Sequence, residues 1–341
     1  MADEVQLSDF SPQGAVYDGL IRSLREGSFV HAYLISGMAG VGKRTLADCM
    51  TRFLLCSGAE KPCGVCPGCV QVRRGDHPDV VAVRPGKLVN SDQPSGKSII
   101  PVDDIREVVR ICGEHTFEGG RRIVRIEQAE KMNPSAQNAL LKTLEEPIEG
   151  NIFLLITDSP SLLLPTIVSR CRHLTLHAWP DKVVEHALTQ SGAMPERRRD
   201  ALRLCEGSIG KALALTSDDG FWERRNEIMR DFFALEERSA IIRVSGSWKD
   251  KRDKADELFS DVEDMVRTLM LVRLGRLGAE ASAAYPAAWQ RMAREAPLDA
   301  FVRLDEGVRE ARMMRANQVT WQAVVERLLF RLMEEKSKWS M

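Results

Sequence analysis

The sequence contains no run of 18 apolar residues, which is about the shortest stretch that crosses a bilayer as a helix. Residues 1–5 are acidic at their centre and lack the basic and apolar regions of a signal peptide. Lysine and arginine (48) nearly balance aspartate and glutamate (49), so the chain has no overall basic field for nucleic acid. We therefore expect a cytoplasmic protein with no membrane partner, whose contacts with nucleic acid are local.

Two patterns divide the 341 residues. Up to about residue 178, short apolar runs alternate with helical patterns, which is typical of a parallel α/β sheet with crossover helices. Beyond that point only helical patterns remain. We expect an α/β domain at 1–178, a small helical domain at 179–216 and an all-α domain at 217–341. The expected strands are 31–36, 80–83, 122–126, 151–157 and 174–176, with a helix over 11–26 and a surface loop at 84–98 that carries Lys87 and Lys97.

A glycine-rich turn at residues 37–43 (Gly-Met-Ala-Gly-Val-Gly-Lys) separates an expected strand from an expected helix at 45–55. Such a turn directs backbone N–H groups at an anion, and the lysine reaches the outer phosphates. The sequence thus predicts a P-loop, with weak or vestigial binding of ATP or ADP. Its candidate residues are Gly37, Gly40, Gly42, Lys43 and Thr45.

Several residues that an ATPase needs are replaced. The position directly after the lysine, where a Ser or Thr hydroxyl binds Mg²⁺, is Arg44, and Thr45 is rotated about 100° away around the helix. The acidic strand end carries Glu127 and Gln128 where working sites use Asp for the metal and Glu to activate water. These replacements argue against hydrolysis by the chain alone.

Four cysteines are clustered, at positions 56, 63, 66 and 69. Their two-residue gaps let neighbouring thiolates bind one tetrahedral Zn²⁺, with Gly64, Pro67 and Gly68 expected to form tight turns. A disulfide pair and an iron–sulfur cluster are the alternative interpretations. The expected module, at about 56–69, is structural because four sulfurs leave no open metal position. Its ligands are Cys56, Cys63, Cys66 and Cys69.

Arg170 follows the apolar strand 151–157 after a helical turn. An ordinary surface arginine would fit this position. A second interpretation is an arginine finger, which neutralises a transferring phosphoryl group in a neighbouring subunit.

Three longer motifs make the pattern specific to a family. They are Gly-Asp-His-Pro-Asp at 75–79, Ala-Gln-Asn-Ala-Leu-Leu-Lys-Thr-Leu-Glu-Glu-Pro at 136–147 and Ser-Arg-Cys at 169–171. With the P-loop and the cysteines, they resemble the subunits of the bacterial DNA polymerase III clamp loader, within the AAA+ superfamily. The resemblance covers about residues 12–335.

Within this family the chain is more similar to the delta-prime type than to the gamma/tau motor. Motor subunits keep Thr after the lysine, Asp-Glu in the acidic motif and an arginine in the lid helix, where this chain has Arg44, Glu127-Gln128 and Gly210-Lys211. We also expect no long basic, proline-rich tail of the kind that tau carries. An ATP-hydrolysing gamma/tau-like motor is the alternative.

The resemblance implies an AAA+ domain with a zinc module, a helical lid and a C-terminal helical collar. It implies partnership with gamma/tau and delta subunits, no appreciable ATPase activity of the chain alone, and Arg170 acting in trans. The complex would place the sliding clamp on primed DNA, while nucleotidyl transfer belongs to the polymerase holoenzyme. Lys131, Lys142 and Arg106 are candidates for contact with DNA phosphates.

Two further functions stay open at this point. A self-sufficient ATPase would use Thr45 and Glu127 as metal ligands, and purified chain would then hydrolyse ATP. A zinc-dependent nucleic-acid-binding protein without ring partners would show salt-dependent affinity for DNA.

Overall fold

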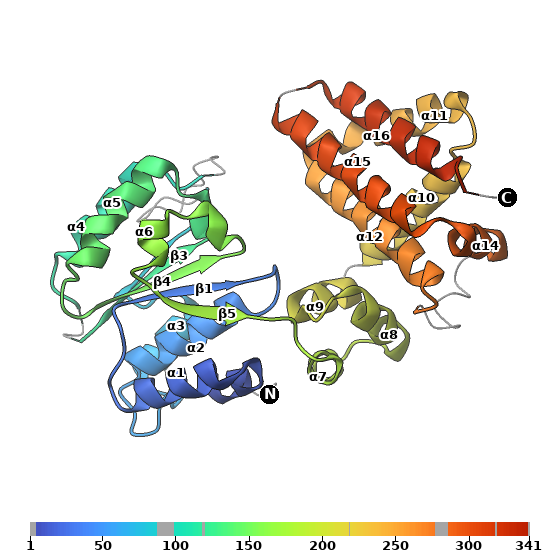
Figure 1. The fold of residues 1–341 in the computed structure, drawn as a ribbon. Coiled ribbons are helices and arrows are strands. Elements are labelled where there is room, and N and C mark those ends of the chain that lie inside the picture. The colour runs from blue at the N-terminus through green and yellow to red at the C-terminus, as the bar shows by residue number, and fades with distance from the viewer. Residues whose placement is uncertain are drawn as a thin grey trace. The chain divides into compact units, whose positions relative to one another are not determined.

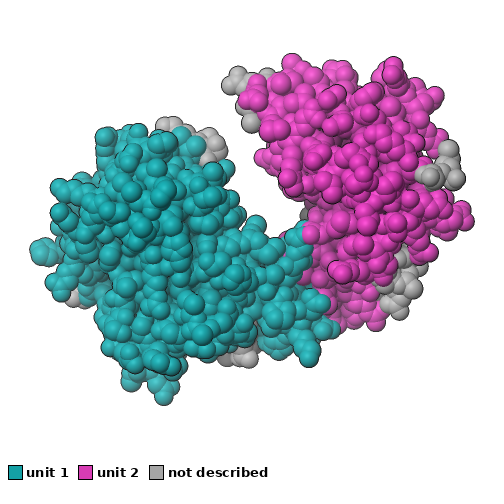
Figure 2. All heavy atoms as spheres, in the orientation of Figure 1, with its two compact units in different colours: residues 1–191, 206–211 teal, residues 192–205, 212–341 magenta. Residues whose placement is uncertain are grey.

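The computed structural model describes residues 5–86, 99–117, 120–217, 219–276, 286–317 and 319–339. Most of the expected loop at 84–98, including Lys87 and Lys97, lies outside the described residues. The chain divides into two compact units, residues 1–191 with 206–211, and residues 192–205 with 212–341 (Figure 2). The finer division at residues 178 and 216 stays a prediction.

The first unit is built on a five-stranded parallel sheet with strand order β2-β3-β4-β1-β5 (Figure 1). Every residue of β4 is buried, as expected for a continuous apolar run in a sheet covered on both faces. The predicted α/β architecture is therefore confirmed. The strands are β1 (Ala32–Gly37), β2 (Val80–Val83), β3 (Arg122–Glu127), β4 (Asn151–Thr157) and β5 (Arg172–Leu176).

Helices cover both faces of this sheet. Helices α4, α5 and α6 lie on one face, and α1, α2 and α3 lie on the other (Figure 1). Helix α5 has a capped start: the Asn133 side chain accepts a hydrogen bond from the Ala136 N–H at 2.8 Å, and Pro134 takes the first helical position. The helices of the first unit up to residue 191 are α1 (Ala15–Arg25), α2 (Lys43–Leu55), α3 (Pro67–Arg74), α4 (Val102–Cys112), α5 (Pro134–Glu145), α6 (Pro165–Val168) and α7 (Asp181–Gln190).

Two local expectations are wrong. The single helix expected over 11–26 is a 3-10 turn, η1 (Leu7–Gln13), followed by α1, because Gly14 adopts a positive φ of 118° that ends one element before the next begins. Pro67 and Gly68 do not form a turn. They open α3, where proline suits the first helical position and the Cys66 sulfur caps the helix by accepting from the Cys69 N–H.

The second unit is entirely helical among its described residues. Its apolar stripes meet in one core that includes Phe259, Phe301 and Leu328, so the all-α prediction for the C-terminal part is confirmed. None of the helices in the described ranges is long and apolar enough to span a bilayer. The helices that follow α7 are α8 (Pro195–Leu204), α9 (Ile209–Ser217), α10 (Asp219–Ala234), α11 (Arg238–Trp248), α12 (Ala255–Arg273), α14 (Ala287–Glu295), α15 (Leu298–Ala316) and α16 (Trp321–Lys336).

Candidate functional site

The glycine-rich loop connects the end of β1 to the start of α2. Gly37, Gly40 and Gly42 have φ values of 144°, 73° and 106°, a region that side-chain-bearing residues rarely adopt. The loop therefore has the strand–loop–helix context that the sequence predicts for a P-loop.

The ammonium group of Lys43 is buried against its own loop. Its Nζ donates to the carbonyl oxygens of Gly37 and Met38 at 2.8 and 2.7 Å. It also forms an ion pair with Asp158 Oδ1 at 2.6 Å, and only 7% of the Lys43 side chain is exposed. A lysine ammonium has three N–H donors, so these three acceptors satisfy it fully.

Arg44 lies beside the acidic strand end. Its Nη2 is 2.9 Å from Oε2 of Glu127, the last residue of β3. Arg125 binds the other oxygen of the same carboxylate, Oε1, at 3.0 Å, and pairs with Asp48 as well. The Glu127 carboxylate is thus held between two guanidinium groups.

The other predicted residues around the loop are Thr45 and Gln128. Thr45 is half-buried, and no side-chain hydrogen bond is formed by its hydroxyl within the described ranges. Gln128 is exposed and adopts a left-handed backbone with φ of 54°. The structure brings Lys43 and Glu127 to one edge of the sheet, where the Glu127 carboxylate is bound by Arg44 and Arg125.

The start of α9 packs directly on the outer side of the loop. The Ser208 hydroxyl donates to the Ala39 carbonyl at 2.9 Å, and the Gly210 N–H donates to the Gly40 carbonyl at 2.8 Å. A Cβ added at Gly210 would lie 2.9 Å from the Gly40 Cα and carbonyl oxygen, so the two glycines allow this close approach. Within the Gly210-Lys211 pair, position 210 therefore has no room for a side chain in this arrangement.

Arg170 lies just after α6 and is partly exposed. Its Nη2 pairs with Glu145 Oε1, at the end of α5, at 2.6 Å, and its Nη1 donates to the Thr166 carbonyl at 2.9 Å. About a third of the side chain (34%) remains exposed. The guanidinium has five N–H donors, so these two contacts leave others for an external acceptor.

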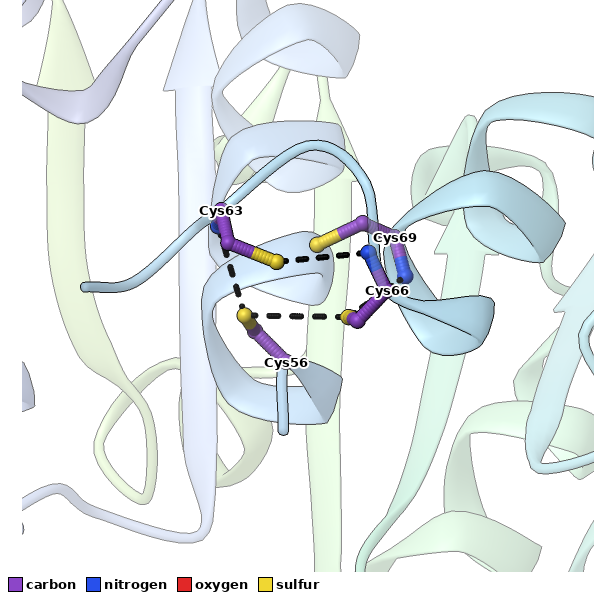
Figure 3. Close-up of side chains that lie close together, drawn as sticks. All are labelled: Cys56, Cys63, Cys66 and Cys69. Atoms are coloured by element: carbon purple, nitrogen blue, oxygen red, sulfur yellow. Dashed lines mark hydrogen bonds between the residues drawn. The ribbon is translucent and has the colours of Figure 1, made fainter. Parts of the chain in front are cut away.

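The four clustered cysteines converge in space. Their sulfur atoms lie within 4.8 Å of one another (Figure 3). The Sγ atoms of Cys56 and Cys66 are 3.8 Å apart. Four sulfurs at about 2.3 Å from a tetrahedral Zn²⁺ would be about 3.8 Å apart, so the spacing fits one ion. All eight cysteines of the chain are free of disulfides.

Backbone N–H groups point at these sulfurs. The N–H groups of Gly58 and Cys63 both donate to Cys56 Sγ at 3.3 Å, and the Cys66 N–H donates to Cys63 Sγ at 3.3 Å. Although burial raises the pKa of the Cys66 thiol, backbone N–H donors outweigh it and lower that pKa to about 5. Such donors stabilise thiolates, which are the metal-binding form of cysteine.

The candidate DNA-contacting residues are all on the surface. Lys131, Lys142 and Arg106 are exposed, and Arg106 pairs with Asp103 at 3.2 Å. They lie on different elements of the first unit, and they form no defined site with one another.

Sequence reasoning missed Asp158 and Arg125, which complete the charge network around the loop. Asp158 directly follows β4, and Glu127 ends β3. Because carboxyl ends of parallel strands share one edge of a sheet, acidic residues just after the predicted strands could have been placed near the P-loop.

Comparison with known proteins agrees with this architecture. Residues 12–180 match the family model described as "DNA polymerase III, delta subunit". The chain is 37% identical over 218 residues to the DNA polymerase III delta-prime subunit of Escherichia coli, which covers 62% of each chain. It is 31% identical over 232 residues to the delta-prime subunit of Haemophilus influenzae, covering 67% of this chain and 68% of the relative.

The motor subunits are also related, but over a smaller share of their length. The chain is 33% identical to the tau subunit of Escherichia coli over 217 residues, which is 61% of this chain and 32% of tau. The matches to delta-prime subunits are longer relative to those proteins, although for the Escherichia coli subunit they still span less than two thirds of its length. On these similarities, together with the P-loop and the cysteine cluster, the chain belongs to the family of DNA polymerase III delta-prime subunits.

Proposed function

We propose that this chain is a delta-prime-like subunit of a clamp loader, which scaffolds the complex and does not hydrolyse ATP itself. Its partners would be gamma/tau and delta subunits, acting in the cytoplasm to place a sliding clamp on primed DNA. Family membership supports this role. The observation that carries the non-hydrolysing part is the Arg44–Glu127 ion pair, which places a guanidinium where an ATPase needs a metal.

Arg170 is the group that we propose to act on a neighbour's nucleotide. It is partly exposed, it lies outside the Lys43 network, and it keeps N–H donors for an external phosphate. The planar fork of a guanidinium matches phosphoryl oxygens in a way that a lysine ammonium does not. Its present partner, Glu145, would be exchanged for the phosphate of the adjacent subunit.

The test is the ATPase activity of a complex reconstituted with motor and delta subunits. At the one site that Arg170 completes, Arg170→Ala should reduce turnover by about 10³-fold or more, and the complex should lose that site's share of its rate. Arg170→Lys should restore little. Arg110→Ala is the matched control, because Arg110 is also an exposed arginine paired with glutamates.

Two outcomes would contradict this proposal. Unchanged turnover in a correctly assembled Arg170→Ala complex would remove the finger role. Mg²⁺-dependent hydrolysis by the purified chain, abolished by Lys43→Ala, would favour the gamma/tau-like motor instead.

We also propose that the four-cysteine cluster holds a structural Zn²⁺. Cys56, Cys63, Cys66 and Cys69 would supply four thiolates, and the ion would cross-link the end of α2 to the start of α3. With all four positions taken by protein sulfur, the ion would contribute to stability and not to catalysis.

A further inference from the structure

Two ion pairs lie at the carboxyl edge of the sheet where a nucleotide and its metal bind in other P-loop proteins. One joins Lys43 to Asp158 and the other joins Arg44 to Glu127. Each pair contains one residue with the charge that a P-loop enzyme has at that position, Lys43 or Glu127, and one partner that the pattern does not include. The unexpected members, Asp158 and Arg44, carry the charges that a ligand would otherwise bring.

Asp158 takes the position of a phosphate oxygen on Lys43. A P-loop lysine ordinarily binds the outer phosphates of a nucleotide. Here the three N–H donors of its ammonium are used by two loop carbonyls and the Asp158 carboxylate, which is the closest of the three acceptors at 2.6 Å. An incoming phosphate would have to displace a carboxylate that is already ion-paired.

Arg44 takes the position of the divalent cation on Glu127. The residue after the P-loop lysine and the acidic residue at the end of the neighbouring strand jointly hold Mg²⁺ in P-loop enzymes. In this chain those two residues contact one another directly at 2.9 Å. Since Arg125 binds the second carboxylate oxygen, both oxygens of Glu127 are occupied by guanidinium groups.

The loop is also fixed from its outer side. Carbonyls of three successive loop residues, 39–41, accept hydrogen bonds from the Ser208 hydroxyl, the Gly210 N–H and the Trp179 indole N–H at 2.9, 2.8 and 2.8 Å. The start of α9 therefore packs on the loop through contacts that involve no nucleotide. The protein itself therefore stabilises the loop conformation that a bound nucleotide would otherwise stabilise.

We propose that Asp158 and Arg44 determine the ligand specificity of this loop, by replacing the phosphate and the metal of a bound Mg²⁺–nucleotide with protein charges and so excluding both. The inference concerns the chain's own loop and does not depend on Arg170 acting on a neighbour. It predicts that the loop can be converted into a nucleotide site by removing these two side chains. Both are accessible for substitution, with 47% of Asp158 and 58% of Arg44 exposed.

Calorimetric titration of the purified full-length chain with ADP, in Mg²⁺ and separately in EDTA, tests this. The unaltered chain should show no measurable binding under either condition. Asp158→Ala frees one donor of Lys43, so ADP binding should appear and be nearly independent of Mg²⁺. Asp158→Ala combined with Arg44→Thr adds a hydroxyl opposite Glu127, and its affinity should be about tenfold higher with Mg²⁺ than with EDTA, the factor given by one charge-assisted interaction.

A second exposed ion pair provides the matched control. Arg309 and Asp305, 2.7 Å apart on α15, can be changed to Thr and Ala together. This variant should behave like the unaltered chain. Circular dichroism would establish that each variant is folded.

Three outcomes would overturn the inference. The first is binding of ADP by the unaltered chain as tightly as by the double variant. The second is a folded double variant that binds no ADP. The third is a gain of binding in the control that equals the gain in the double variant.

Discussion

Asp261 is a buried carboxyl group in the helical unit. It lies on α12, 3.4 Å from Arg224 Nε, with only 9% of its side chain exposed. Its pKa is raised to about 6, chiefly by burial; the Arg224 guanidinium lowers the pKa, and the charges of Asp264 and Glu257 raise it. The folded protein therefore binds a proton more tightly at this site than the unfolded chain does.

This shift predicts a pH-dependent stability. Because the folded pKa exceeds the usual value of 3.8, the contribution of Asp261 is most favourable below about pH 4 and is lost as pH rises through 6. Asp261→Asn should remove this dependence, so its melting temperature should exceed that of the unaltered chain at pH 7 and fall toward it at pH 4. Thermal melts at several pH values measure the difference. Asp256→Asn, an exposed site on the same helix, is the control; equal pH profiles for Asp261→Asn and the unaltered chain would contradict the prediction.

At the scale of single residues, local sequence patterns predict the candidate site residues but not all of the residues that contact them. The spacing of the cysteines and of the P-loop glycines is local, so both clusters were predictable. Asp158 and Lys43 are far apart in the chain and meet only because β4 and β1 are neighbours in the sheet. No local sequence pattern shows that β4 and β1 are neighbours, so the sequence alone does not predict the Lys43–Asp158 pair.

At the scale of the secondary-structure elements, the form of the cysteine module would depend on the Zn²⁺ that we propose. Cys66 caps α3, Cys69 lies in its first turn and Cys56 ends α2. Between the helices is a short segment without regular structure, in which Val65 is 82% exposed. A bound ion would therefore supply much of the order of this segment.

Loss of one thiolate should release the metal. We expect about one equivalent of zinc per chain in the unaltered protein and less than about half an equivalent in Cys66→Ser, because four-thiolate sites depend on every ligand. Elemental analysis by mass spectrometry measures both. Val65→Ser, in the same loop, should keep its zinc. Retention of a full equivalent by Cys66→Ser, or its absence from gently purified unaltered protein, would argue against the site.

The sequence predicts the boundaries of a helix or strand correctly where one physical signal dominates. The run at 151–157 is apolar throughout, and β4 occupies those residues with complete burial. Helix α3 was missed because Pro67 and Gly68 resemble turn residues, whereas proline at the first helical position and a sulfur cap make them a helix start. The cap depends on the position of the Cys66 sulfur, which the sequence alone does not show.

On the scale of the whole molecule, the two units have separate cores. The buried apolar residues of the helical core all fall within residues 228–339. They include the T-shaped pair Phe232–Phe233 and the fully buried Trp248. This core needs no side chain from the sheet-containing unit among the residues that the structure describes.

A fragment spanning residues 212–341 should therefore fold by itself. We expect a helical circular dichroism spectrum and a cooperative thermal transition. A shorter fragment, 255–341, lacks α10 and α11 and with them Phe232 and Trp248, so it should lose cooperative unfolding. Equal cooperativity in both fragments, or none in the longer one, would show that the core is not organised as described.

The close contact between Gly40 and Gly210 limits the substitutions that the chain can accept at position 210 during evolution. A side chain at position 210 would first have to push α9 off the loop, since its Cβ alone would lie 2.9 Å from Gly40. An arginine there would thus carry a steric cost before it could contribute any charge to a nucleotide. For the non-hydrolysing subunit that we propose, a change toward a working motor would require substitutions in a particular order, with the packing of α9 on the loop loosened first.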